Sequence, residues 1–161
     1  MTVRARRVAT ASAAVALAVG LLAWWLAAAP ENEPGIALRP DDAETVALGR
    51  EVYARECASC HGAGLEGQAD WRARKPDGRL PAPPHDDSGH TWHHPDGQLF
   101  ALTKHGPAAL VGGDYQSDMP AYDGALSDGE IIAVLSFIKS TWPADVRARH
   151  DQINRQARRQ D

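Results

Sequence analysis

Two cysteines and a histidine are the residues of this chain whose types and spacing could do chemistry. Cys57, Cys60 and His61 form the pattern C-x-x-C-H, and the chain has no other cysteine. Residues three apart in a helical turn share one face, so the two thiols can reach the two vinyl groups at one edge of a porphyrin. The adjoining His61 can then supply the axial nitrogen that haem iron requires. The spacing therefore predicts a covalently attached haem and redox or haem-based chemistry.

Three other uses of the two cysteines fit the sequence less well. A zinc site needs two further ligands at finger-like spacing, and only His90 with His94 provides such a pair. A thioredoxin-type dithiol follows a strand within a βαβ pattern, which is not visible around the motif. A disulfide across a two-residue gap would be strained and would close almost no loop. Haem attachment is the interpretation that the sequence favours.

The second axial ligand decides whether the predicted haem transfers electrons or binds small molecules. The chain has two methionines, and Met1 is far from the motif, so Met119 is the candidate thioether ligand. It directly precedes Pro120 in a polar, glycine-rich segment, which is typical of a loop rather than of an apolar helix face. We therefore expect His61 and Met119 to be the metal ligands. A histidine in place of Met119 would give a bis-histidine haem of lower potential.

With an early C-x-x-C-H motif, a late Met-Pro pair and a closing helix, residues 43–142 resemble the class I cytochromes c. Gly49 and Tyr53 match the small and aromatic positions where the first helix of that family crosses the last, and Val134 and Phe137 match the positions facing them. The resemblance implies an all-α fold of three to four helices around one covalent haem c. It also implies that a carbonyl in the proline-rich stretch 81–84 holds the imidazole of His61.

The resemblance implies an electron carrier rather than an enzyme. Residues 90–96 and 136–143 are similar to a membrane-anchored bacterial subset with a single haem. The expected donor is a quinol-oxidising complex or a dehydrogenase, and the expected acceptor is a terminal oxidase or reductase. Two alternatives stay open at this point. One is a haem enzyme or sensor with a labile distal ligand, and the other is a copper-handling module that uses the histidine cluster from His85 to His94.

The first 30 residues differ in composition from the rest of the chain. Three arginines precede an uncharged, largely apolar run at residues 8–29. At ~1.5 Å per residue, a helix of this length spans ~33 Å, enough to cross the hydrocarbon core of a bilayer. The arginines favour export of everything that follows, and Pro30 with the Trp24–Trp25 pair favours an uncleaved anchor over a cleaved signal. We expect a transmembrane segment at 1–30, a tether at 31–42 and an extracytoplasmic haem domain.

The charge of the exported part bears on its partners. Residues 31–161 contain 14 basic and 21 acidic side chains, and residues 43–142 contain 8 basic and 14 acidic ones. Nucleic acid as a partner would demand a basic face, so the acidic balance argues against it. Redox proteins with a positive docking patch are the partners that this charge favours.

Capping signals predict where the helices begin and end. Asp41 or Asp42 can cap a first helix, Pro95 and Gly106 delimit a middle one, and Ser127 forms a capping box at the start of the last core helix. Pro143 is expected to stop that helix. Residues 62–94 lack periodicity and are too long for an ordinary connection unless they pack on a cofactor. Residues 143–161 are expected to form a polar, solvated helical tail.

Overall fold

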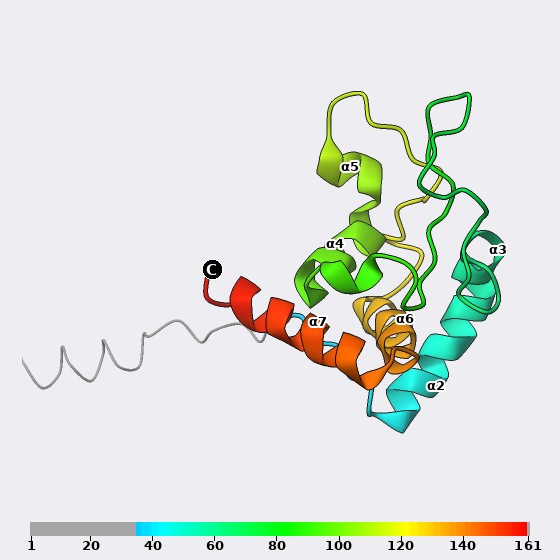
Figure 1. Cartoon of the computed structure of the whole chain (residues 1–161). Helices are drawn as coiled ribbons and strands as arrows, with labels where there is room; N and C mark the ends of the chain where they lie inside the picture. Colours follow the sequence, from blue (N-terminus) through cyan, green and yellow to red (C-terminus); the bar gives the residue numbers. More distant parts are fainter. Residues whose placement is uncertain (1–34, 161) are drawn as a thin grey trace, which may run out of the picture. The chain divides into compact units, whose positions relative to one another are not determined.

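The computed structural model describes residues 35–160, which are mostly helical and contain no β-strand (Figure 1). The prediction of an all-α haem domain agrees with this. The predicted membrane segment at residues 1–30 lies outside the described residues. No helix within residues 35–160 is long and apolar enough to cross a membrane. The helical segments are α2 (Ala43–Val52), the π-helical turn η1 (Tyr53–Cys57), α3 (Ala58–His61), the 3₁₀ turn η2 (Thr91–His93), α4 (Asp96–His105), α5 (Pro107–Val111), α6 (Asp128–Ser140) and α7 (Ala144–Ala157).

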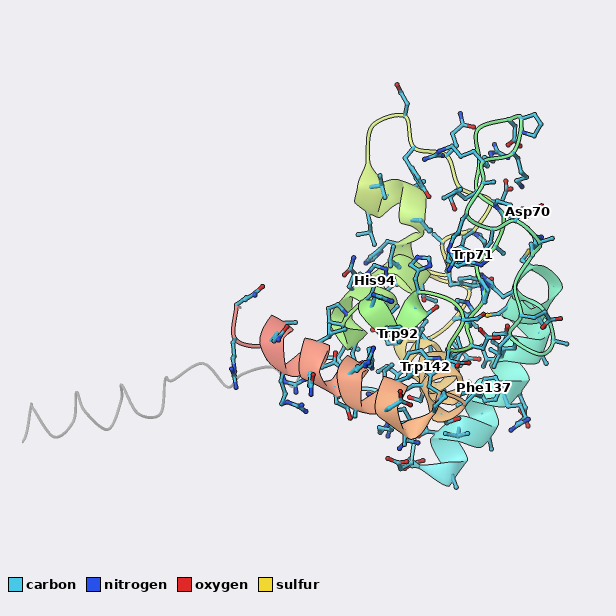
Figure 2. The ribbon with its side chains drawn as sticks, in the orientation of Figure 1. Asp70, Trp71, Trp92, His94, Phe137 and Trp142 are labelled. Carbon is cyan, nitrogen blue, oxygen red and sulfur yellow. The ribbon has the colours of Figure 1, made fainter. Side chains whose placement is uncertain are left out.

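Helix α2 packs across α6, and the crossing depends on a glycine. Phe137 lies where α6 meets α2 (Figure 2). A Cβ atom at Gly49 would collide with the backbone of Ala133 and with the side chain of Phe137. Because glycine has no Cβ, the two helices approach closely at this point. The ring of Tyr53 then packs on the ring of Phe137, with centroids 5.5 Å apart. The helix crossing that the resemblance implies is therefore confirmed.

The caps of the predicted helices lie within a residue of their expected places. The Asp42 carboxylate accepts a hydrogen bond of 2.8 Å from the backbone N–H of Thr45 and caps α2. Helix α4 follows Pro95 and ends at His105, and its C-cap is Gly106, which has a φ of 78°. At the start of α6, the predicted capping box of Ser127 and Glu130 is complete. These signals are encoded within three or four residues, so the sequence alone reveals them.

Helix α6 ends before Pro143, as predicted, and the proline lies two residues beyond the C-cap Thr141. Helix α6 ends at Ser140, where side-chain hydroxyl groups donate hydrogen bonds to the last carbonyl groups. Thr141 Oγ1 donates to Ile138 O at 2.7 Å. Such side-chain bonds compete with continuation of the helix. Pro143 is also the N-cap of α7, where its missing N–H costs nothing. Trp142, between the two helices, is buried and donates from Nε1 to His85 O at 2.7 Å.

Helix α7 is anchored to the haem domain by polar side chains that are buried. Asn154 Nδ2 donates to Asp96 Oδ1 at 2.9 Å, and the Asn154 side-chain oxygen accepts from the Asp96 backbone N–H at 2.7 Å. His150 is completely buried, and its Nε2 donates to His94 O at 3.0 Å. Lys139 on α6, also buried, pairs with Asp151 at 2.6 Å. The segment expected to be solvated is therefore a helix with one face packed against α4 and α6.

The described part of the expected tether is also packed against the domain. Leu38 is buried in the core, and its backbone N–H donates to the Asp96 carboxylate at 3.0 Å. The next N–H, that of Arg39, donates to Ser136 Oγ on α6 at 2.9 Å. Both bonds satisfy backbone donors that a free tether would leave to water. Residues 38 and 39 therefore belong to the folded domain, whereas residues 31–34 lie outside the described part of the chain.

Candidate functional site

The C-x-x-C-H motif lies on a helical turn, as predicted, and the turn that leads into it is π-helical. Helix α2 continues into η1, which ends at Cys57, and α3 then carries the rest of the motif. Single π turns inside helices are frequent at functional sites. The C-cap of α3 is Gly62, whose φ of 81° is a left-handed conformation that favours glycine. His61 is thus the last residue of the helix, and the chain turns away directly after it.

Two buried tyrosines bind the backbone on either side of the motif. Tyr53 Oη donates to Gly62 O at 2.8 Å, and Tyr122 Oη donates to Glu56 O at 2.8 Å. Burial raises the pKa of Tyr122 to about 12 and the pKa of Tyr53 still further, so both hydroxyls stay protonated donors at neutral pH. The sequence gives no signal for the Tyr122 bond, because its partner is 66 residues away. Together the tyrosines fix both ends of the motif.

His61 is held in the tautomer that binds a metal through Nε2. The imidazole is buried, and its Nδ1 donates to Pro83 O at 2.8 Å. This proline is in the stretch 81–84 that the resemblance implicates. Because Nδ1 carries the proton, Nε2 keeps its lone pair, and the bond also fixes the plane of the ring. Burial lowers the pKa of His61, with the Pro83 bond opposing it, which favours the neutral form.

A second histidine supports the ring of His61. His85 stacks on His61 with ring centroids 3.9 Å apart and an interplanar angle of 21°. Its Nδ1 lies 2.8 Å from Thr91 Oγ1, and its backbone carbonyl accepts from Trp142. Burial, together with the neighbouring His61 and His90, lowers the pKa of His85 well below its ordinary value. His85 is therefore a neutral packing partner, a role that residue type and spacing do not reveal.

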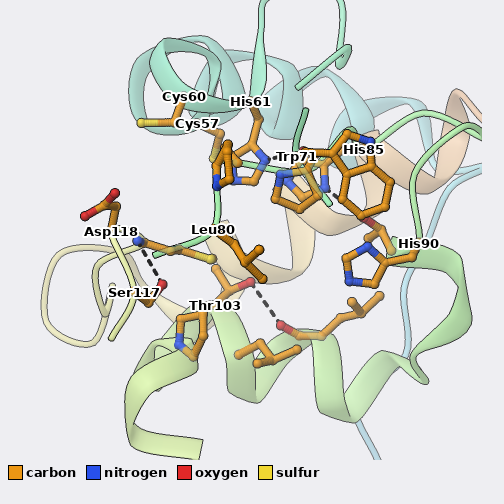
Figure 3. A pocket seen from close by; sticks show the side chains of 18 of the residues that line it. Cys57, Cys60, His61, Trp71, Leu80, His85, His90, Thr103, Ser117 and Asp118 are labelled. Atoms are coloured by element: carbon orange, nitrogen blue, oxygen red, sulfur yellow. Dashed lines mark hydrogen bonds between the residues drawn. The ribbon is translucent and has the colours of Figure 1, made fainter. Parts of the chain in front are cut away.

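The predicted site residues line a single cavity of about 680 Å³. This volume lies within the ~300–1,000 Å³ that is usual for cofactor sites. Cys57 and His61 lie on one side of the cavity, and Ser117 and Thr103 lie across it (Figure 3). Met119, in the loop of residues 112–120 that follows α5, also lines the cavity. Apolar side chains of α4 and α6 complete the wall: Leu99, Leu102, Val134, Leu135 and Ile138.

The donor set and the lining fit an iron porphyrin. A mostly apolar wall suits the macrocycle, and a neutral imidazole with a thioether is a known ligand pair for haem iron. The two cysteines are free thiols, so the disulfide alternative is not found. Burial, with smaller contributions from Glu56 and Cys60, raises the pKa of the Cys57 thiol to about 11. The Cys57 thiol therefore stays protonated at neutral pH, and both free sulfurs lie in the lining of the cavity.

The remaining histidines do not form a second metal site. His90 stacks on Trp71 with centroids 5.2 Å apart, and His94 meets His90 edge-on at 5.6 Å. No group of three or more histidine, cysteine or acidic side chains among residues 35–160 is arranged to hold a metal ion. The copper alternative for the cluster from His85 to His94 therefore finds no preformed site in the described part of the chain. His85, His90 and His94 instead line the cavity.

An ion-pair cluster joins two loops at the mouth of the cavity. Asp118 Oδ2 lies 2.6 Å from Lys75 Nζ, and Asp118 Oδ1 lies 2.7 Å from Arg79 Nη1. The two cations lower the pKa of the Asp118 carboxyl. Both Lys75 and Asp118 line the cavity together with Met119. We call these three charged residues, Lys75, Arg79 and Asp118, the loop clasp.

Comparison with known proteins identifies the family. The cytochrome c family model matches residues 46–142, which is more than half of the chain. No curated protein and no solved structure matches the chain significantly. The matched range contains the cysteine pair, His61, the supporting tyrosines and the apolar wall of the cavity. The chain therefore belongs to the cytochrome c family, as a class I cytochrome c whose covalently attached haem c fits Cys57 and Cys60.

Proposed function

We propose that this protein is a membrane-tethered cytochrome with one haem, which carries single electrons between redox proteins on the extracytoplasmic side. His61 and Met119 are the axial ligands in this proposal, and Cys57 and Cys60 hold the haem. The observation that carries it is the placement of all four side chains on one cavity with a mostly apolar wall. Haem c, when bound, supplies reversible one-electron exchange at its iron.

The residues around the cavity act by keeping the site rigid. Pro83 O fixes the plane and tautomer of the His61 imidazole, and the stacked ring of His85 limits its tilt. Tyr53 and Tyr122 hold the backbone on both sides of the motif. Rigid ligands on both sides would keep the coordination the same in both oxidation states, which suits electron transfer more than chemistry on a substrate.

The tether and the partners are supported by the sequence. The apolar run at residues 8–29 behind three arginines suits a membrane anchor with the haem domain outside the cytoplasm. The acidic balance of residues 43–142 suits a donor or acceptor with a positive docking patch. We propose a quinol-oxidising complex or dehydrogenase as donor and a terminal oxidase or reductase as acceptor. Recovery of the haem protein in the soluble periplasmic fraction, with residues 1–30 removed, would contradict the tether.

Optical spectroscopy of a Met119→Ala variant tests the ligand assignment. Haem with histidine and methionine ligands shows a sulfur-to-iron charge-transfer band when oxidised, so we expect the wild-type band to be absent from the variant. The reduction potential should fall, because a thioether ligand raises it. The ferrous variant should bind carbon monoxide at neutral pH, whereas the wild type should not. Gln116→Ala, on the same loop and also lining the cavity, is the matched control and should keep the band.

Two results would contradict the proposal in different ways. If Met119→Ala kept both the band and the potential, another side chain would be the distal ligand. If the ferrous wild-type protein bound carbon monoxide readily at neutral pH, the distal position would be labile. That second result would favour the alternative of a haem enzyme or sensor.

A further inference from the structure

The loop clasp connects two parts of the chain that approach the cavity from different sides. Lys75 and Arg79 belong to the long loop that follows α3, on the side of His61. Asp118 belongs to the loop after α5, and it directly precedes Met119. The two ion pairs span 43 and 39 residues of sequence. Figure 3 shows Asp118 and Ser117 beside each other at the edge of the cavity.

Both partners of Asp118 are arranged on one tight turn. The backbone N–H of Lys75 donates to Arg79 O at 2.8 Å, and Gly78 closes the turn by donating to Lys75 O at 2.8 Å. Gly78 has a φ of 84°, which favours glycine at this position. Arg74 Nη1 also donates to Gly78 O at 2.6 Å. The turn thus presents two cations together, and each binds a different oxygen of the same carboxylate.

The loop that carries Met119 has few other attachments near that residue. The Met119 backbone N–H donates only within its own loop, to Ser117 Oγ at 3.1 Å. The next bonds to another element are those from the backbone N–H of Tyr122 to carbonyls of Thr103 and Lys104 on α4. Residues 111–114 are exposed. The clasp is therefore the cross-loop attachment closest in sequence to Met119 among the described contacts.

We propose that Asp118 is a positioning residue: its pairs with Lys75 and Arg79 fasten the Met119 loop to the opposite loop and keep the thioether at the cavity. This inference rests on the proposed ligand role of Met119. The ion pairs of the loop clasp lower the rate at which the Met119 loop opens. The thioether leaves the cavity only when this loop opens. In this role Asp118 acts through the loop and is not itself a ligand of the iron.

The exposure of the clasp makes its effect sensitive to salt. The side chains of Lys75, Arg79 and Asp118 are 37, 40 and 42% exposed. Ion pairs this exposed are screened by added electrolyte, and each shifts an equilibrium by up to about five-fold. Arg79 Nε is buried and has no hydrogen-bond partner among the described residues, so this guanidinium is already partly removed from water. The ion pair with Asp118 offsets part of the free-energy cost of removing the guanidinium from water.

Imidazole binding to the oxidised holoprotein tests the proposal. Imidazole can reach the iron only after Met119 has left, so its limiting binding rate at high concentration reports loop opening. We expect Asp118→Asn to raise this rate about ten-fold at low ionic strength, as the product of two exposed ion pairs. Added sodium chloride should raise the wild-type rate towards that of the variant and leave the variant rate unchanged. Lys75→Gln and Arg79→Gln should each raise the imidazole rate by less than Asp118→Asn does. Asp118→Glu, which keeps the negative charge, should stay close to the wild-type rate.

An ion pair elsewhere in the domain provides the matched control. Arg147 and Asp41 lie 2.7 Å apart and also join distant parts of the chain, but neither lines the cavity. Asp41→Asn should therefore leave the imidazole rate unchanged. If Asp41→Asn raised the rate as much as Asp118→Asn does, the effect would be one of general stability, and the proposal would be wrong.

The same experiment separates this inference from the proposed function. If Met119→Ala lost the charge-transfer band but Asp118→Asn kept the wild-type rate at low salt, the ligand assignment would stand and the clasp would be wrong. If Met119→Ala kept the band, the ligand assignment and the clasp would both be wrong. If Asp118→Asn failed to incorporate haem, the single Lys75 and Arg79 variants would decide, and unchanged rates in both would overturn the proposal.

Discussion

His150 is completely buried although its helix, α7, is rich in charged residues. The neutral ring satisfies both nitrogens: Nε2 donates to His94 O at 3.0 Å, and Nδ1 lies 3.5 Å from Asn154 Nδ2. Burial and the positive charge of Lys139 lower the pKa of His150, and the carboxylates of Asp96 and Asp151 oppose this only in part. The folded protein therefore resists protonation at this position.

This burial predicts a loss of stability in mild acid. Below about pH 6.5, the usual pKa of histidine, the unfolded chain takes up a proton at residue 150 that the folded chain does not. The free energy of unfolding should therefore fall as the pH falls from about 7 towards 5. His150→Gln should make this dependence shallower, as measured by guanidinium denaturation of the holoprotein. His105→Gln, an exposed control on α4, should leave the pH dependence unchanged. If the wild type, His150→Gln and His105→Gln all showed the same slope of unfolding free energy against pH, the assignment to His150 would be wrong.

Buried polar residues mark the limit of what residue type predicts. Asn154 and Asp96 are 58 residues apart, and each alone is typical of a solvent-exposed position. Their pairing becomes visible only when α7 is packed against α4. The same holds for Asp118, whose cations lie about 40 residues earlier in the chain. By contrast, Cys57, Cys60 and His61 could be assigned from sequence because their chemistry depends on local spacing.

At the scale of helices, the crossing of α2 and α6 depends on the absence of a side chain at Gly49. A methyl group there would overlap the backbone of Ala133, which cannot move without shifting α6. We expect Gly49→Ala to lower the free energy of unfolding by about 1–3 kcal/mol, the usual cost of overpacking. Gly97→Ala on α4, where a Cβ meets no atom within 4 Å, is the control and should be neutral or slightly stabilising. Equal melting temperatures for both variants would contradict this reading of the crossing.

The helices that could be predicted are those with local signals at their ends. The Asp42 cap, the box of Ser127 with Glu130, and the pair of Pro95 and Gly106 each place an end correctly. Helix α5 was missed because it has only five residues and none of them is buried. Pro143 marks the end of α6 as predicted, but its second role as the N-cap of α7 was missed because it depends on how the next segment packs.

At the scale of the whole molecule, the cofactor replaces a large part of the core. The cavity of about 680 Å³ is walled by core residues of α4 and α6, including Leu99, Val134 and Ile138. Without the haem, this apolar wall would face water, and the hydrophobic burial that it provides in the holoprotein would be lost. Small domains have only about 5–15 kcal/mol of stability in total. The fold is therefore expected to depend on the haem.

A chain without haem should be largely unfolded. The variant Cys57→Ala, Cys60→Ala cannot attach the cofactor, and we expect it to lose most of its helical circular-dichroism signal and its cooperative thermal transition. Ser59 lies between the two cysteines, and Ser59→Ala leaves both thiols intact. This control variant should keep the helical signal and the cooperative transition. A double variant with the full helical signal and a cooperative melt would show that the polypeptide folds without the porphyrin.

The π-helical turn η1 makes the length of the segment before Cys57 as important as its residue types. Each hydrogen-bonded turn of a π-helix encloses one residue more than a turn of an α-helix. Deleting Ala54 would remove that extra residue and leave a regular α-helical turn, so the sulfurs and the imidazole would keep roughly their direction. Deleting Glu51 from the regular helix α2 would instead rotate all three by about 100° relative to the crossing at Gly49. Mutational scans should thus find that a one-residue deletion is tolerated better at residues 54–56 than within α2.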